Sequence, residues 1–185
     1  MTIDDVQQIF HRFDKHIKTL RDISMDTANK VPLCDCLDTA YCYDDIVNAE
    51  FQGGDIFDSV DAITIKKDCI NFIEFKNTDM SHLKSTDMRL KIAEGFHYIE
   101  KVVLKANFFA AHGIKTRFIL VYSKEKNVRE SKKQKEMNDA LMAFSTLQIH
   151  NRFIGKGRYD KKWEYVDEAI SMDEIEFKNN REKYV

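Results

Sequence analysis

The sequence has a single proline, four cysteines and no long apolar run among its 185 residues. No stretch approaches the roughly 18 consecutive apolar residues that cross a bilayer, which argues against a membrane protein. Four cysteines are too few for a disulfide scaffold in a chain of this length, so we expect a cytoplasmic protein. The first five residues, Met1 to Asp5, are acidic and do not resemble a signal peptide.

The composition is that of an ordinary globular protein. Hydrophobic residues make up 43% of the chain and charged residues 32%, which excludes a disordered chain. There is no internal repeat, long linker or low-complexity stretch. We therefore expect a single domain over residues 1–185 with a substantial core.

The charge is nearly balanced in total but unevenly distributed. The formal net charge is −2, from 29 basic and 31 acidic residues, which taken alone argues against nucleic-acid binding by bulk charge. Residues 31–65 contain no Lys or Arg but eight acids, whereas residues 115–135 contain eight bases and two acids. The eight acids are Asp35, Asp38, Asp44, Asp45, Glu50, Asp55, Asp58 and Asp61. The basic segments could track a phosphate backbone or form a solvated surface.

Periodicity predicts the order of the elements. Helices are expected at 3–23, 85–111 and 131–146, a β-hairpin at 56–76, and strands at 116–122 and 147–154. Residues 33–55 are irregular by pattern, and the hairpin turn at 66–68 lacks Asn-Gly or Asp-Gly, so a loose loop is expected. A capping box that begins at Ser171 predicts a short C-terminal helix. The fold class is therefore α/β, with a sheet covered by helices on both faces.

Three charged residues of the hairpin form the strongest candidate site. Glu74 and Lys76 are two apart on a strand and project to the same face. A hairpin centred between residues 67 and 68 places Asp61 directly opposite Glu74, with the two Cβ atoms roughly 4.5–5.5 Å apart. Two carboxylates this close repel unless one is protonated or a cation lies between them. Divalent cations such as Mg²⁺ take such oxygen ligands, and Lys76 could hold a phosphate oxygen or orient a water.

The alternative is that these residues are surface charges that form salt bridges. Glu-x-Lys alone is a weak signal, because Ile73-Glu-Phe-Lys-Asn77 recurs word for word as Ile175-Glu-Phe-Lys-Asn179. The second copy follows the capping box, so its Glu176 and Lys178 should point to different sides of a helix. The context of the first copy, at the end of an apolar strand, favours a functional role for it.

Val60-Asp61 and Ile73 to Asn77, with twelve residues between Asp61 and Glu74, resemble the core motif of the PD-(D/E)xK nuclease superfamily. Val60 stands in the place of the motif proline. The resemblance covers about residues 45–125 and implies a restriction-endonuclease-like α-β-β-β-α-β core with a central mixed sheet. The core would span about residues 33–125, with the helix at 3–23 and an extension at 127–185 packed on it.

The resemblance also implies roles for individual residues. Asp61, Glu74 and the main-chain carbonyl of Phe75 would bind Mg²⁺ or Mn²⁺, and Lys76 would position or activate the attacking water. Many members supply a further acid from the first helix. Here the third acid is left open between Glu50 and an aspartate of residues 3–23, which are Asp4, Asp5, Asp14 and Asp22.

These observations favour a metal-dependent nuclease, with a DNA endonuclease as the preferred form and a homodimer left open. Lys91, Lys115 and Arg117 are candidate contacts to nucleic acid. Because of the near-zero net charge, we expect DNA affinity to be modest and metal-dependent. Two alternatives remain: a catalytically silent nuclease-like fold that acts as a protein-binding or immunity module, and an accidental motif in an unrelated α/β enzyme. A zinc or iron–sulfur site at Cys34, Cys36 and Cys42 is less favoured than simple thiols.

Overall fold

A computed structural model describes residues 2–50, 58–80, 85–105, 114–127 and 166–185. Within these ranges the chain forms one six-stranded sheet in the order β1-β4-β5-β6-β7-β8 and a separate two-stranded sheet. The six strands are β1 (Ile17–Thr19), β4 (Thr39–Cys42), β5 (Ala62–Lys66), β6 (Cys69–Lys76), β7 (Lys115–Tyr122) and β8 (Glu168–Asp173). The small sheet pairs β2 (Met25–Asp26) with β3 (Val31–Pro32).

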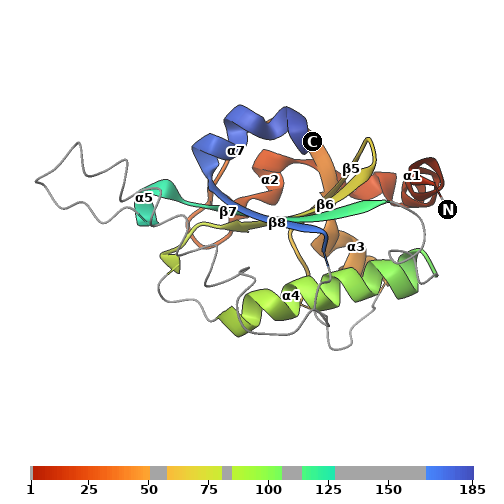
Figure 1. Ribbon diagram of the computed structural model, residues 1–185. Helices are drawn as coiled ribbons and strands as arrows, with labels where there is room; N and C mark the ends of the chain where they lie inside the picture. The colour runs from red at the N-terminus through yellow and green to blue at the C-terminus, as the bar shows by residue number, and fades with distance from the viewer. Residues whose placement is uncertain (1, 51–57, 81–84, 106–113, 128–165) are drawn as a thin grey trace, which may run out of the picture.

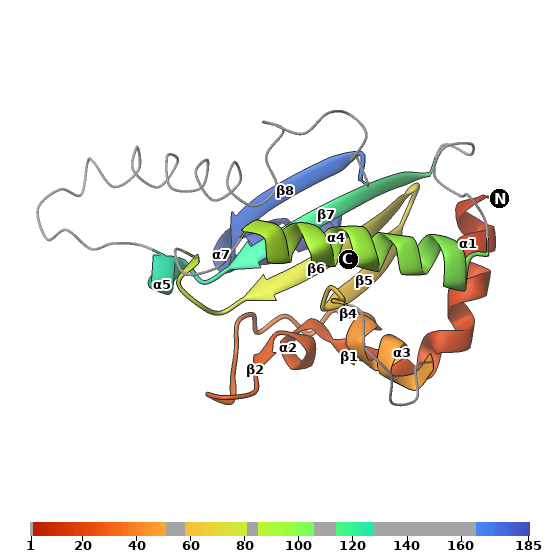
Figure 2. The same ribbon diagram turned by 90° about the horizontal axis from the view of Figure 1, so that it is seen from below.

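The large sheet is mixed. Neighbouring strands from β1 to β6 are antiparallel, whereas β7 runs parallel to both β6 and β8. Helices cover both faces, as expected for an α/β protein (Figure 1). On one face lie α3 (Tyr43–Glu50) and α4 (Ser85–Tyr98), and Figure 2 shows α4 running across the strands. On the other lie α2 (Leu20–Ile23) and α7 (Glu174–Asn180).

Alternation along β6 divides its side chains between two cores. Ile70 and Phe72 pack with α3 and α4, together with Val6 and Phe10 of α1 (Ile3–Phe10). Ile73 and Phe75 pack on the opposite face, where the Phe75 ring meets Phe177 of α7 edge to face at 5.8 Å between centroids. Because side chains alternate along a strand, Glu74 and Lys76 belong to the α4 face.

The hairpin register is confirmed. The pairs run from Ala62 opposite Ile73 to Lys66 opposite Cys69, and in each pair the residue numbers add up to 135. The expected loose loop is wrong, because only Lys67 and Asp68 connect the two strands. Lys67 takes a positive φ of 55°, which permits the two-residue connection without Asn-Gly or Asp-Gly.

The single helix expected at 3–23 is wrong. Helix α1 continues as a 3₁₀ turn (His11–His16), and the chain then enters the edge strand β1 and the short helix α2. Thr19 stops β1 and caps α2, because its side chain accepts a hydrogen bond from the Asp22 amide at 3.1 Å. Apolar spacing alone does not reveal that β1 interrupts the helical pattern. The helical turns before and after β1 place their apolar side chains at the spacing that a single helix would have.

Other boundaries also differ from expectation. Residues 33–55, which are irregular by pattern, contain β4 and α3. Helix α4 ends at Tyr98 and continues as a π-helical turn (Ile99–Val103), short of the expected end at 111. The remaining described elements are α5 (Lys124–Asn127) and a 3₁₀ turn (Arg181–Lys183).

The C-terminal helix begins later than the capping box suggests. Ser171 lies in β8, and the N-cap of α7 is Asp173, whose side chain accepts from the Glu176 amide at 2.8 Å. Strand β8 itself was not anticipated. The helix expected at 131–146 and the strand expected at 147–154 lie outside the described residues.

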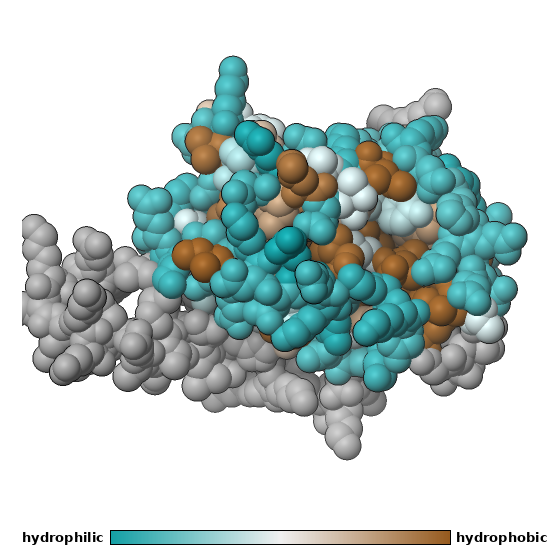
Figure 3. Space-filling view, turned by 90° about the horizontal axis from the view of Figure 1, so that it is seen from above, coloured by the Kyte–Doolittle hydropathy of each residue, from teal (hydrophilic) through white to brown (hydrophobic). Residues whose placement is uncertain are grey.

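Polar groups dominate the surface on the α7 side. Figure 3 looks onto this side and shows several separate apolar groups among hydrophilic ones. Large exposed apolar side chains include Leu37 and Ile175, which are 70% and 49% exposed. Within the described part of the chain, no helix has both the length and the apolar character needed to cross a bilayer.

Candidate active site

The end of β6 carries a fully buried carboxylate. Glu74 follows five apolar or uncharged residues of the strand and has 0% exposure, on the face covered by α4. Its Oε1 lies beside the ammonium of Lys76 and 3.0 Å from the Nζ of Lys91, which comes from α4. A buried charge is costly unless it is paired, and these two lysines supply the pairing.

The pairing leaves the carboxylate incompletely satisfied. Both Glu74 oxygens are buried without a well-directed hydrogen bond from any described residue, although both lysines lie at ion-pair distance from Oε1. Buried polar atoms of this kind are uncommon in folded proteins and call for an explanation. Oxygen acceptors with free lone pairs are the donor type that Mg²⁺ and Mn²⁺ prefer.

Asp61 lies one step beyond the last β5–β6 pair, at the position opposite Glu74. Its carbonyl accepts from the Tyr43 amide at 3.0 Å, and its Oδ2 accepts from the Phe75 amide at 2.5 Å. Burial, and next the nearby Glu74 carboxylate, raise the pKa of Asp61 well above its ordinary value. The two acids expected to share a cation therefore do interact electrostatically.

Substituting Asp61 with asparagine should stabilise the protein in the presence of a chelator. The pKa of Asp61 is raised in the folded state, so stability falls as pH rises from about 4, the pKa in the unfolded chain, through the folded pKa. Removing the ionisable group should therefore raise the free energy of unfolding by about 1 kcal/mol or more near neutral pH. The difference in the free energy of unfolding between wild type and Asp61→Asn should close at about pH 4, where Asp61 is protonated in the folded protein.

Thermal unfolding of wild type and Asp61→Asn at the two pH values measures this effect. Asp68→Asn is the control, because Asp68 is 65% exposed in the turn of the same hairpin. A lower melting temperature for Asp61→Asn near neutral pH would contradict the electrostatic description.

Asp44 is a third acid near this pair. It lies in the first turn of α3, and its Oδ1 accepts a hydrogen bond from the Ser59 hydroxyl. Burial raises the pKa of Asp44, against the hydrogen bond from Ser59 and the charge of Lys91, and the Glu74 carboxylate adds to the rise. Asp44 therefore shares the electrostatic environment of Glu74 and Lys91.

Neither expected source of a third acid reaches the site. Glu50 lies six residues beyond Asp44 on α3, about 9 Å along the helix axis, and its charge acts on Tyr98. Among the first-helix candidates, Asp5 accepts from the Thr2 amide, Asp14 from the Tyr41 hydroxyl and Asp22 from the Thr19 hydroxyl. Asp4 lies with Asp5 in the first turn of α1. Asp44 was missed because sequence periodicity did not place α3.

The three candidate nucleic-acid contacts are separated. Lys91 lies inside the site, with its ammonium on Glu74. Lys115 and Arg117 pair in register with Cys69 and Asn71, so Lys115 lies five residues, about 17 Å, before Glu74 along the sheet. Arg117 is engaged by Glu168 at 2.6 Å. A nucleic-acid role for Lys115 and Arg117 stays a prediction, and their position does not bring them to the carboxylates.

Several acids of residues 31–65 form salt bridges away from Glu74. Asp35 pairs with Lys178 at 2.8 Å, Asp38 with Arg181 at 2.8 Å, and Asp45 with Lys18 at 2.6 Å. These contacts join the segment to α7, to the 3₁₀ turn that follows it and to β1. Among the described acids of residues 31–65, Asp44 and Asp61 interact electrostatically with Glu74.

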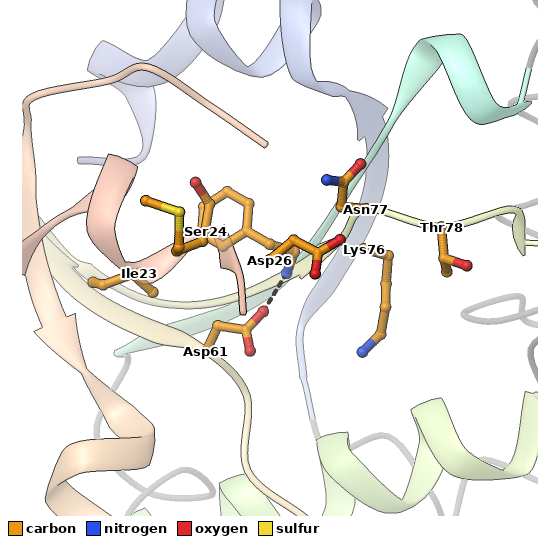
Figure 4. A pocket seen from close by; sticks show the side chains of 9 residues that line it. Ile23, Ser24, Asp26, Asp61, Lys76, Asn77 and Thr78 are labelled. Atoms are coloured by element: carbon orange, nitrogen blue, oxygen red, sulfur yellow. Dashed lines mark hydrogen bonds between the residues drawn. The ribbon is translucent and has the colours of Figure 1, made fainter. Parts of the chain in front are cut away.

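A pocket of about 280 Å³ opens beside Asp61. Asp61 and Lys76 line it together with Asn77 and Thr78, and residues 23–26 form the facing wall (Figure 4). Asp26 in that wall accepts hydrogen bonds from the Asn29 side chain and from the Ala28 and Asn29 amides. These hydrogen bonds lower the pKa of Asp26, and the bond from the Asn29 side chain has the largest effect. The pocket gives a small polar group access to Asp61 and Lys76.

The residues present fit a divalent cation, though not a site built from side chains alone. Within the described ranges, no three His, Cys, Asp or Glu side chains are placed to hold a metal ion. Magnesium sites often use one or two carboxylates, with water and substrate oxygens completing the shell. Asp61, the unsatisfied oxygens of Glu74 and the Phe75 carbonyl match that pattern.

The four cysteines do not form such a site. Cys34, Cys36, Cys42 and Cys69 are free and buried. Burial raises the pKa of Cys34 to about 12 and that of Cys42 to about 11, which disfavours the thiolate that binds metals.

Comparison of the chain with models of protein families, with curated proteins and with solved structures finds no match.

Proposed function

We propose that the protein is a metal-dependent nuclease that hydrolyses phosphodiester bonds, with DNA as the preferred substrate. The observation that carries the proposal is the fully buried Glu74 carboxylate, whose oxygens lack directed hydrogen bonds, opposite Asp61. Structural salt bridges seldom bury an acid this deeply without satisfying its oxygens. A cation-binding role accounts for both the burial of the carboxylate and its lack of directed hydrogen bonds.

Asp61, Glu74 and the carbonyl of Phe75 would hold Mg²⁺ or Mn²⁺. When bound, the cation would offset the charge that develops on the phosphate and on the attacking oxygen. Lys76 lines the pocket beside Asp61 with its side chain 21% exposed, so its ammonium can meet a phosphate oxygen or orient a water. The Phe75 amide holds Asp61 through its Oδ2 and so fixes the carboxylate at the pocket wall.

The order of elements supports the nuclease-like fold within this proposal. Helix α1 precedes the antiparallel strands β4, β5 and β6, and α4 connects β6 to the parallel strand β7. With β1, α2, β2, β3 and α3 left aside, these elements follow the α-β-β-β-α-β order that the motif resemblance implies. The candidate site lies where β5 begins and β6 ends.

Incubation with plasmid DNA, single-stranded DNA and RNA tests the proposal. Cleavage of DNA is expected with Mg²⁺ or Mn²⁺, and it should stop on addition of chelator. DNA binding should be modest and weaker without metal, because the net charge is only −2. Cleavage that persists unchanged in chelator would reject the proposed chemistry. Absence of both cleavage and Mn²⁺ binding, with a stable protein complex instead, would favour the catalytically silent binding module.

A further inference from the structure

The carboxylate of Glu74 has two lysine partners from different elements. Lys76 comes from the same strand, whereas Lys91 comes from α4 on the overlying layer. The Nζ of Lys91 lies 3.0 Å from Glu74 Oε1 and also donates to the Ser59 carbonyl at 2.9 Å. With a side chain 22% exposed, Lys91 is directed into the site.

Two hydrogen bonds join α4, near Lys91, to α3 and to the residues that precede Asp61. The Tyr43 hydroxyl donates to the Gly95 carbonyl at 2.7 Å, which fixes α4 against α3. The Glu94 carboxylate accepts from the Asp58 amide at 2.7 Å, three residues before Asp61. Helix α4 therefore presents Lys91 to Glu74 from a fixed position.

Two lysines already meet the acids of this site without a metal. Lys76 and Lys91 both lie at ion-pair distance from Glu74, and Asp61 and Asp44 interact electrostatically with Glu74. A divalent cation added to this arrangement would meet two ammonium groups already directed at its ligands, and like charges at that range repel strongly.

We propose that Lys91 is a built-in counter-ion that holds Glu74 in the metal-free protein and competes with the divalent cation for it. Lys91 is a positioning residue in this role, and the inference rests on the proposed function. Its bond to the Ser59 carbonyl retains the ammonium near the site when Glu74 is taken by the cation. The device stabilises the fold without metal at the expense of metal affinity.

Titration calorimetry with Mn²⁺ alone tests the inference. Lys91→Met and Lys91→Gln should bind Mn²⁺ at least about tenfold more tightly than wild type, which is about 1.4 kcal/mol. Lys91→Gln can keep the hydrogen bond to Ser59, so it separates the charge from the contact if Lys91→Met fails to fold. Lys91→Arg retains the competing charge and should bind as wild type does.

Two comparisons complete the design. Lys178→Met removes the same charge from an exposed pair with Asp35 and should leave Mn²⁺ affinity unchanged. Without metal, Lys91→Met should melt below wild type, and saturating Mn²⁺ should raise its melting temperature more than that of wild type.

The outcomes separate the inference from the proposed function. Binding that depends on Glu74 but is equal or weaker in Lys91→Met and Lys91→Gln would overturn the role of Lys91 and leave the nuclease proposal intact. Mn²⁺ binding that is absent, or unchanged in Glu74→Gln, would overturn both. Tighter binding in Lys178→Met as well would show a general charge effect and overturn the inference.

Discussion

Replacing Glu74 by glutamine is expected to reduce metal-dependent DNA cleavage by about a thousandfold or more. Glutamine keeps the shape of the side chain but removes the charge that would hold the cation. In wild type this carboxylate is completely buried with neither oxygen in a directed hydrogen bond. The rate of plasmid nicking with Mg²⁺ in excess measures the loss.

The chain provides a matched control for this substitution. Glu176 lies in the second copy of the five-residue sequence and is exposed. It is in the first turn of α7, whereas Glu74 lies near the end of a buried strand. Glu176→Gln should cleave at the wild-type rate. Because Glu74→Gln also leaves two lysines without their buried partner, its melting temperature should be measured to show that it folds. Activity retained in folded Glu74→Gln would place the reaction elsewhere.

Replacing Lys76 by methionine should lower cleavage by about a hundredfold or more, with Mn²⁺ binding retained. Methionine preserves the apolar stem that lies along the pocket but removes the ammonium beside Asp61 and Glu74. Metal affinity should not fall, since the three oxygen ligands are intact and a positive charge has left.

Lys178→Met is the control for Lys76→Met. Lys178 holds the equivalent position in the second copy of the five-residue sequence and pairs with exposed Asp35. Its cleavage rate should match that of wild type. Equal rates for Lys76→Met and wild type would remove Lys76 from the reaction. A parallel loss of cleavage and Mn²⁺ binding would instead indicate that Lys76 acts only by shaping the carboxylate pair.

The local parts of the site could be predicted from sequence. The β-hairpin is a local pairing, so its centre fixes the partner of every residue, and the pairing of Asp61 with Glu74 follows from the confirmed register. The two copies of the sequence Ile-Glu-Phe-Lys-Asn could be assigned different roles, because one ends an apolar strand and the other follows a helix N-cap.

The parts that depend on tertiary contacts could not be predicted. Asp44 reaches the site only because the short strand β4 pairs with β5 and turns directly into α3, and neither element is long enough to give a clear period. Lys91 was expected at a nucleic-acid surface, since helical spacing does not show that α4 crosses the end of β6. Asp35 and Asp38 pair with Lys178 and Arg181, which are distant in the sequence, and periodicity does not predict such partners.

A crystal grown with Mn²⁺ and measured for anomalous scattering tests the central claim most directly. The account predicts one anomalous peak bounded by the carboxylates of Asp61 and Glu74 and the carbonyl of Phe75, at about 2.0–2.2 Å from each oxygen. The same crystal of Glu74→Gln should lack the peak. Crystals of wild type with saturating Mn²⁺ and no peak between these three oxygens, or with the peak unchanged in Glu74→Gln, would contradict the assignment of this site.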